Sequence, residues 1–378
     1  MKINFDQLAK KSVQSSPAYS SARSLVSKDK GLRIKDKVFL DANENAFGSV
    51  IPRIAGVDLS RYPDPLAEKL RAQLAKFVGV APKNILVGNG SDEIIWLLLL
   101  AFVEAQEEIL TFAPTFSMYR VFAELLGLKV VEVPLAKDYS LDTQKFLAKI
   151  SAKTKLIFLC SPNNPTGQTV PLAALEKILA RGKITIVDEA YIDFAPGKSA
   201  LRLLKKYSNL IILRTFSKAW GLAGLRVGFG VMCSEAVDVL KKVRAPYSVD
   251  ALSQKLAGDA LKNSAKMQTT VKKILTERKK LIQNLTQLGI KIFPTDANFL
   301  LAQFPTRVSA PKVQQTLLQK FGIVLRDFSK NASLQNCIRV TVGNKKENEE
   351  LVRALGKTMK AEKANKVSKV GKANKVSE

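Results

Sequence analysis

The sequence contains no histidine among its 378 residues. This absence excludes Ser-His-Asp and Cys-His catalysis and any metal site built on imidazole. Cysteine is also scarce, because the three cysteines (Cys160, Cys233 and Cys337) are widely spaced and form no CxxC pair. We therefore expect no disulfide framework, no metal centre and a reducing, cytoplasmic location. Acid–base chemistry must come from Lys, Asp, Glu, Tyr, Cys or a cofactor.

Long hydrophobic runs are missing as well. The longest apolar run covers the ten residues 94–103 and ends at Glu104, whereas a membrane-spanning helix needs about 20. The first eleven residues carry scattered charges and lack the apolar core of a signal peptide. We expect no association with a membrane.

Positive charge is in excess: 60 basic and 33 acidic residues give a net charge of +27. Such a surface can attract nucleic acids or anionic metabolites. No nucleic-acid-binding motif accompanies the charge, so we favour a solvated basic surface and do not expect a nucleic-acid partner. Residues 357–378 form a lysine-rich, repetitive tail that could contact polyanions, although a passive, mostly disordered tail is the simpler interpretation.

The apolar pattern divides the chain. Between residues 85 and 231, seven short apolar runs alternate with helical stretches, which predicts an α/β domain with a mostly parallel seven-stranded sheet covered on both faces. A long helical stretch over residues 251–288 follows and leads into a smaller α+β domain, whose last helix is expected over residues 346–355. The expected segments are an N-terminal arm, a large domain, a small domain and the basic tail, over residues 1–48, 49–250, 251–356 and 357–378.

Polar motifs stand where three of the predicted strands end. Asn163-Asn164-Pro165-Thr166-Gly167 follows one strand, Asp188-Glu189-Ala190-Tyr191 ends a second, and Thr215-Phe216-Ser217-Lys218 ends a third, with Arg226 shortly after. Ligands of open α/β sheets bind beside the carboxyl ends of the strands. These three motifs therefore form the candidate site.

Their residue types suit pyridoxal phosphate. A lysine amine can bond to its aldehyde, and a carboxylate facing the pyridine nitrogen keeps the ring protonated, so that the ring accepts electrons. A tyrosine hydroxyl and an asparagine amide can hydrogen-bond the ring oxygen, while hydroxyl groups and an arginine hold the phosphate. The residues in those roles are Lys218, Asp188, Tyr191, Asn164, Thr215, Ser217 and Arg226.

A second phosphate-binding device precedes them. The turn Gly88-Asn89-Gly90 connects a predicted strand to a helix that begins near Ser91 and Asp92. Backbone N–H groups at a helix start, and the Ser91 hydroxyl, can bind an anion. Taken singly, each motif has a structural alternative, since Ser91 and Asp92 could simply cap the helix. Their joint order makes coincidence improbable.

From about Ala18 to Leu355, the chain resembles the fold-type I pyridoxal-phosphate aminotransferases. The lysine, aspartate and Asn-Pro-Thr-Gly motifs are shared by that whole superfamily. The Asp-Ala-Asn-Glu-Asn segment at 41–45, Arg-Tyr-Pro-Asp at 61–64 and Arg-Val-Thr-Val-Gly at 339–343 are similar to those of the subgroup that acts on histidinol phosphate. The resemblance implies transamination between histidinol phosphate and 2-oxoglutarate, with Lys218 as the proton-transfer group.

The resemblance also implies further site residues. Phe116 would stack on the pyridine ring, and Tyr62 would reach the cofactor phosphate of a partner subunit, which implies a homodimer with shared active sites. Residues implied to bind the substrate are Arg339, Arg326, Tyr19 in the N-terminal arm, and Asn45. Histidinol phosphate carries a phosphate and glutamate carries carboxylates, so one site must accept either anion, which paired arginines can do.

Two other activities fit the same cofactor residues. One is transamination of aromatic amino acids, and the other is decarboxylation of threonine phosphate; the residues around Tyr19, Asn45 and Arg326 would separate them. A cofactor-dependent transcription regulator is a third class. Fewer than about fifty residues precede the Asn-Glu-Asn segment, which is short for a DNA-binding module.

Overall fold

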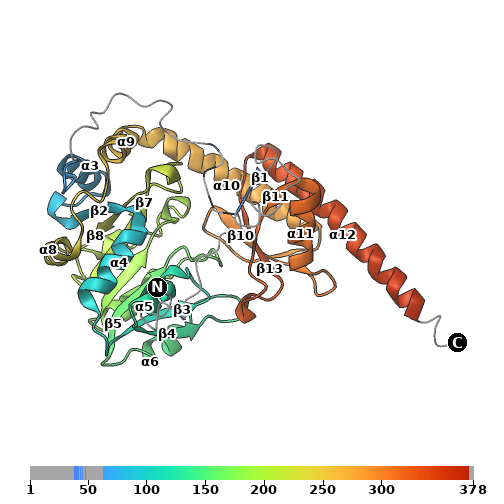
Figure 1. Cartoon of the computed structure of the whole chain (residues 1–378), viewed down its shortest axis with the longest axis horizontal. Coiled ribbons are helices and arrows are strands. Elements are labelled where there is room, and N and C mark those ends of the chain that lie inside the picture. The colour runs from blue at the N-terminus through green and yellow to red at the C-terminus, as the bar shows by residue number, and fades with distance from the viewer. Residues whose placement is uncertain (1–37, 42, 44, 46, 48–62, 374–378) are drawn as a thin grey trace, which may run out of the picture. The chain divides into compact units, whose positions relative to one another are not determined.

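The computed structural model describes residues 38–41, 43, 45, 47 and 63–373. These residues belong to two compact units. The first comprises residues 63–271, and the second comprises the described residues up to Phe47 together with 272–373. Each unit has its own sheet (Figure 1). The sequence pattern predicts this change near residue 250, whereas the two units divide between residues 271 and 272, within the helix α10 (Ser264–Gln287).

A seven-stranded sheet forms the centre of the first unit. Its strands, in spatial order, are β2 (Ile85–Asn89), β8 (Val227–Val231), β7 (Leu210–Thr215), β6 (Ile184–Asp188), β5 (Thr154–Cys160), β3 (Glu108–Ala113) and β4 (Lys129–Pro134). β8 runs antiparallel to both of its neighbours, and the pairs from β7 to β4 are all parallel. The predicted mostly parallel α/β sheet is confirmed.

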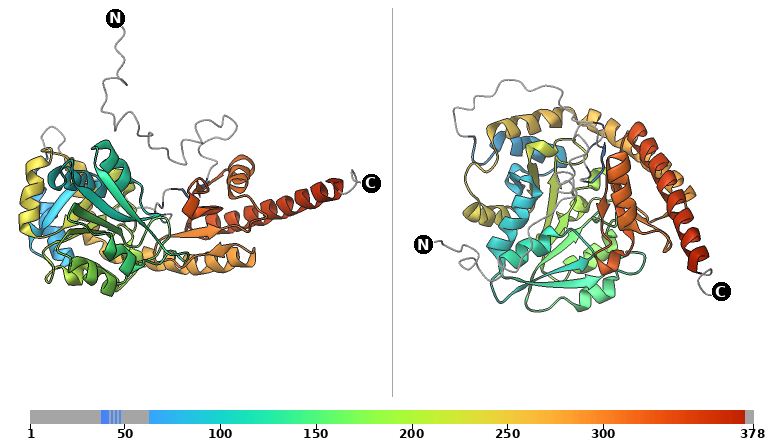
Figure 2. Two further views of the ribbon diagram at one scale, coloured as in Figure 1. Left: turned by 90° about the horizontal axis from the view of Figure 1, so that it is seen from below. Right: turned by 45° about the vertical axis from the view of Figure 1, so that its right-hand side comes forward.

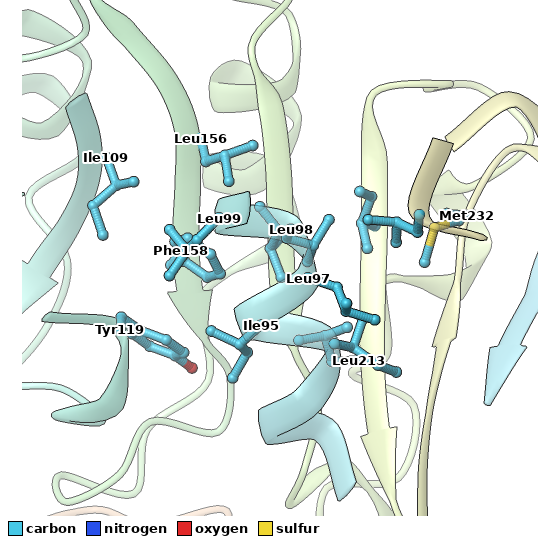
Figure 3. Close-up of a cluster of buried hydrophobic side chains, with 14 of the residues drawn as sticks. Ile95, Leu97, Leu98, Leu99, Ile109, Tyr119, Leu156, Phe158, Leu213 and Met232 are labelled. Carbon is cyan, nitrogen blue, oxygen red and sulfur yellow. The ribbon is translucent and has the colours of Figure 1, made fainter. Parts of the chain in front are cut away.

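Helices surround this sheet (Figure 2). They are α3 (Glu68–Val78), α4 (Gly90–Phe102), α5 (Met118–Leu125), α6 (Thr143–Ala148), α7 (Leu172–Leu179), α8 (Ser234–Val243) and α9 (Ala251–Lys262). α4 is the most apolar of these helices, and it packs its leucines and isoleucines against the sheet (Figure 3). Tyr119 and Phe158 belong to the same buried cluster, so the hydrophobic core extends to the strand ends where the polar motifs lie.

Strand direction decides where those motifs meet. β5, β6 and β7 are parallel neighbours, so their carboxyl ends lie at one edge of the sheet. β8 runs the opposite way and begins at that edge, just after Arg226. β2 is antiparallel to β8 and therefore ends there as well, where α4 begins. All the predicted cofactor-binding motifs of this unit thus share one sheet edge, as expected for an open α/β sheet.

The second unit contains a four-stranded antiparallel sheet and a short parallel pair. The sheet has the order β12 (Arg326–Asp327), β13 (Cys337–Thr341), β10 (Phe299–Gln303) and β9 (Lys291–Ile292), and the pair joins β1 (Val38–Phe39) to β11 (Ile323–Val324). α11 (Ala310–Phe321) ends at Gly322, whose φ of 66° is left-handed, a conformation that glycine adopts without strain. α11 packs against α12 (Lys345–Ala373).

Two helical expectations were wrong. The stretch expected over 251–288 is interrupted at Asn263, which separates α9 from α10 (Ser264–Gln287). The last helix was expected to end near Leu355, with a disordered tail after it, but α12 continues to Ala373. Extending an existing helix avoids the cost of nucleation, and this segment is rich in Lys and Ala and lacks proline. Within the described residues, no helix is long and apolar enough to cross a membrane.

Candidate active site

Lys218 lies in the loop after β7, next to the strand that ends at Asp188. Its Nζ atom is 5.6 Å from the centroid of the Tyr191 ring. Tyr191 follows β6 and is buried, with 5% of its surface exposed. The amine and the phenol ring thus come from neighbouring strand ends, as the sequence pattern predicts.

Asp188 is a buried acid of this edge, and hydrogen bonds fix its carboxylate. Its side chain is 3% exposed. The Tyr119 hydroxyl donates a hydrogen bond of 2.7 Å to Oδ2, and the backbone N–H of Ala190 donates one of 3.1 Å to Oδ1. Burial raises the pKa of Asp188 to about 6, and the two hydrogen bonds oppose that shift. A cation placed beside this carboxylate would favour its ionised form.

Tyr119 was not among the residues singled out from the sequence. Its ring stacks on Phe158 with centroids 4.9 Å apart, and the predicted Phe116 meets it edge-on at 5.5 Å. Burial raises the phenol pKa of Tyr119, so the hydroxyl stays protonated and acts as a donor. Burial also raises the thiol pKa of the neighbouring Cys160, which keeps that group neutral. The available signal was an aromatic residue in the segment after β3.

An anion-binding cradle lies at the same edge of the sheet. Arg226 has a left-handed backbone with φ 53°, and its guanidinium is 3.3 Å from Asp92 Oδ2 and 3.5 Å from Ser217 Oγ. Ser217 Oγ is in turn 2.9 Å from Thr215 Oγ1. Asp92 therefore contacts the arginine directly. In this position its carboxylate can orient the Arg226 guanidinium, and the predicted contact of Asp92 with the cofactor stays a prediction.

Two glycines keep this cradle open. A Cβ atom on Gly90 would lie 2.7 Å from the Arg226 guanidinium, and one on Gly228 would lie 2.3 Å from the backbone nitrogen of Ser91. Both distances are shorter than real Cβ contacts allow. At Gly228 the neighbour is backbone, so the close approach of β8 to the start of α4 requires glycine there. At Gly90 the neighbour is the movable end of Arg226, and the positive φ of 75° is what favours glycine. The result is a group of donors for one compact anion, made of the N-terminus of α4, hydroxyl groups and Arg226.

These residues fit pyridoxal phosphate. The cradle matches its phosphate, the buried Asp188 carboxylate matches a protonated pyridine nitrogen, and the Lys218 amine matches its aldehyde. Asn164 is 8% exposed at the end of β5. Its neighbour Asn163 donates to Pro114 O at 3.0 Å and thereby ties the loop after β5 to the loop after β3.

A buried ion pair connects the ends of β6 and β7. Glu189 Oε2 accepts hydrogen bonds from Arg214 Nε at 3.0 Å and Nη2 at 2.8 Å, and Glu189 Oε1 accepts one from the backbone of Ala200 at 2.6 Å. The pair lies one residue after Asp188 and just before the Thr215–Lys218 segment. This pair was not among the site residues predicted from the sequence, although an arginine directly after the apolar run Leu210–Leu213 was a visible signal.

The second unit holds the two arginines implied to bind the substrate. Arg326 and Arg339 are directly opposite each other on β12 and β13, so their side chains leave the same face of the sheet. Each guanidinium lies 5.8 Å from the Phe328 ring. Arg339 is 7% exposed and donates a hydrogen bond of 2.5 Å to the carbonyl of Asp41. Like charges opposite each other repel, and a bound anion would relieve that repulsion.

Of the remaining predicted site residues, the structure describes one and leaves two outside the described residues. Asn45 is 9% exposed, and its Oδ1 accepts a hydrogen bond of 3.0 Å from the backbone of Phe47. Tyr19 and Tyr62 lie outside the described residues. Among the residues that are described, no cluster of acidic or cysteine side chains could hold a metal ion.

Comparison with known proteins places these features in a family. Residues 35–355 match the model of the aminotransferases of class I and II. The histidinol-phosphate aminotransferase of Cytophaga hutchinsonii is 38% identical over 94% of this chain and 99% of its own length. Histidinol-phosphate aminotransferase 1 of Carboxydothermus hydrogenoformans is 42% identical over 85% of this chain and 93% of its own.

A solved structure gives the same picture. The histidinol-phosphate aminotransferase of Sinorhizobium meliloti, crystallised in complex with pyridoxal 5'-phosphate, superposes with a TM-score of 0.83. The two sequences are 26% identical, and the match covers 93% of this chain and 97% of that one.

Replacing Asp188 by asparagine should stabilise the cofactor-free protein at about pH 8. The wild-type carboxyl has a pKa of about 6 when folded and 3.8 as its ordinary value. The folded state therefore holds the proton more tightly, and wild-type stability falls as the pH rises between these values, by about 3 kcal/mol in total. Urea unfolding across this pH range checks the difference. Parallel stability curves for the two proteins would contradict it.

Proposed function

The chain belongs to the family of class I and II aminotransferases, and we propose that it transfers the amino group of L-histidinol phosphate to 2-oxoglutarate. The products are imidazole-acetol phosphate and glutamate, and the reaction is a step of histidine biosynthesis. The main observation in support is the 38% sequence identity to a histidinol-phosphate aminotransferase over 94% of this chain. The cofactor is pyridoxal phosphate, as bound in the Sinorhizobium meliloti structure.

Lys218 is the proposed catalytic residue. When bound, the cofactor supplies an aldehyde that takes up the amino group and a protonated ring that accepts negative charge. The Lys218 amine holds the cofactor before the substrate arrives. Once released, Nζ removes a proton from the amino-bearing carbon of the substrate and then returns one as an acid. Its place in a loop between two strand ends supports this role.

The other residues of the sheet edge orient the cofactor ring. Asp188 pairs with the protonated pyridine nitrogen, because its buried carboxylate is held by two donors and favours a cationic partner. Tyr191 and Asn164 hydrogen-bond the ring oxygen, and Phe116 packs on the ring. The role of Tyr191 is supported by the distance of 5.6 Å between its ring centroid and the Lys218 Nζ atom.

The phosphate occupies the cradle at the start of α4. Ser91 supplies its backbone N–H and hydroxyl, while Thr215, Ser217 and Arg226 supply further donors. Asp92 aims the Arg226 guanidinium through their contact of 3.3 Å. Charge-assisted hydrogen bonds from several fixed donors would anchor the cofactor by its phosphate.

The anionic end of the substrate binds to Arg326 and Arg339. Their side chains share one face of the small sheet, as cross-strand partners do. A guanidinium donates two hydrogen bonds to a phosphate or to a carboxylate. One pair can therefore take histidinol phosphate in the first half of the reaction and 2-oxoglutarate in the second. Asn45 and Tyr19 complete this part of the site.

Histidinol phosphate by itself should convert the cofactor of the loaded protein from its aldehyde form to its amine form. We would follow the cofactor absorbance without a keto acid, with phenylalanine and threonine phosphate run in parallel. Lys218→Ala should slow the conversion by about 10²–10⁴-fold or more. Preference for phenylalanine would make the enzyme an aromatic aminotransferase, and release of carbon dioxide from threonine phosphate would make it a decarboxylase.

Arg339→Gln should raise the KM of both histidinol phosphate and 2-oxoglutarate. Loss of hydrogen bonds to a charged group corresponds to roughly a ten- to hundredfold increase. Steady-state kinetics with each substrate varied in turn measures this change. Arg307→Gln, at an exposed position of the same unit, is the matched control. An effect on one substrate only would refute a shared anion site.

We further propose a cytoplasmic homodimer in which Tyr62 of each chain reaches the cofactor phosphate of the other active site. The family resemblance supports the shared site, and the scarcity and wide spacing of the three cysteines support a reducing compartment. Light scattering should give about twice the chain mass of 41.5 kDa. Mixed Lys218→Ala and Tyr62→Ala chains should recover turnover at low cofactor concentration. Recovery that never exceeds the sum of the separate variants would refute shared sites.

A further inference from the structure

We propose that Tyr119 is a positioning residue for Asp188: its hydroxyl keeps the carboxylate ionised and aimed at the ring nitrogen of the cofactor. The inference rests on the proposed role of Asp188 and extends it to a residue that contacts neither the substrate nor the reacting atoms. Tyr119 would act on the reaction through the proton of the ring nitrogen.

Geometry carries the proposal. The Tyr119 hydroxyl is 2.7 Å from Asp188 Oδ2, and the contact is buried. The two residues lie 69 positions apart, on α5 and at the end of β6, so this bond is no accident of local chain geometry. The backbone N–H of Ala190 donates a hydrogen bond of 3.1 Å to the other carboxylate oxygen, Oδ1. Each carboxylate oxygen thus has one fixed donor and keeps lone-pair directions for a cation.

Packing prevents the hydroxyl from turning away. The Tyr119 side chain has no exposed surface. Its ring is held between the stacked ring of Phe158, tilted by 20°, and the edge-on ring of Phe116, at 83°. Figure 3 shows Tyr119 beside Phe158 and Ile95 in the hydrophobic cluster. A donor fixed in this way needs no rearrangement when charge develops nearby.

The electrostatic surroundings explain why such a donor is needed. Burial favours the neutral carboxyl, and the carboxylates of Asp92 and Glu189 act in the same direction. Glu189 is largely compensated by Arg214, and Cys160 faces Asp188 as a neutral thiol. A neutral carboxyl cannot stabilise a protonated ring nitrogen. The hydrogen bond from Tyr119 opposes these effects, and in a buried site it is stronger than in water.

The test uses Tyr119→Phe, which removes the hydroxyl and keeps the stacked ring. The holoenzyme is loaded with pyridoxal phosphate that is isotope-labelled at the ring nitrogen, and its magnetic resonance shift is followed with pH. The variant should lose the ring proton about one to two pH units below the pH at which the wild type loses it. The dissociation constant of the cofactor should rise roughly ten- to hundredfold. Loss of the ring proton should lower kcat but leave the KM of histidinol phosphate nearly unchanged.

A double-mutant cycle separates this role from simple packing. In an Asp188→Asn background, the Tyr119→Phe change should alter cofactor affinity by less than about threefold, because the carboxylate it serves is gone. An equal effect in both backgrounds, or an unshifted ring nitrogen in Tyr119→Phe, would overturn the proposal. Tyr207→Phe is the control for loss of a tyrosine hydroxyl, because Tyr207 is partly exposed and is not among the site residues.

Two further outcomes remain interpretable. If Tyr119→Phe does not fold, a ring-fluorinated tyrosine at the same position supplies a stronger donor, and loss of the ring proton should then move to higher pH; no movement overturns the proposal. The wild-type protein could fail to react with histidinol phosphate while Tyr119→Phe still lowers the pH at which the ring nitrogen loses its proton. That result would refute the proposed substrate and support the role of Tyr119. An unchanged ring nitrogen in Asp188→Asn would overturn both residue roles.

Discussion

Asp188 carries a carboxyl group at the buried carboxyl end of β6, where loss of solvent raises its pKa to about 6. A buried carboxylate is costly unless donors and a cation compensate it. The surrounding structure supplies those donors from two directions, Tyr119 on α5 and the backbone of Ala190. The cation that we propose for this carboxylate is the protonated ring nitrogen of the cofactor. Much of the site follows from this one requirement, since Lys218 is placed on the adjacent strand end and Glu189–Arg214 fixes the two strands to each other.

The phosphate cradle depends on a different constraint, which is the close approach of backbone segments. Gly228 lies so near Ser91 that a methyl group would overlap the chain, and Arg226 adopts a left-handed backbone just before it. Left-handed residues other than glycine are uncommon and are typical of functional turns. Here that conformation turns the Arg226 guanidinium toward Asp92 and Ser217.

Within the second unit, strand pairing brings together the two arginines that we propose to bind the substrate. Arg326 and Arg339 meet because β12 and β13 are antiparallel in that register; a shift by one residue would turn one of them to the opposite face. Asn43 adds a brace, since its backbone nitrogen donates to Thr341 Oγ1 at 3.1 Å and its carbonyl accepts from Asn298 at 3.0 Å. This brace holds the segment whose Asp41 carbonyl accepts from Arg339.

The sequence by itself determined the α/β class, the seven strands of the large sheet, and the cofactor, because periodicity and strand-end motifs are local properties. The roles of individual residues in the site stay predictions. Tertiary structure alone decided that Tyr119 meets Asp188 and that Asn43 meets Thr341, which lies 298 positions away. It also decided the break at Asn263 and the length of α12. Such contacts depend on strand order and register, and these arise from the packing of the whole domain, which no single segment encodes.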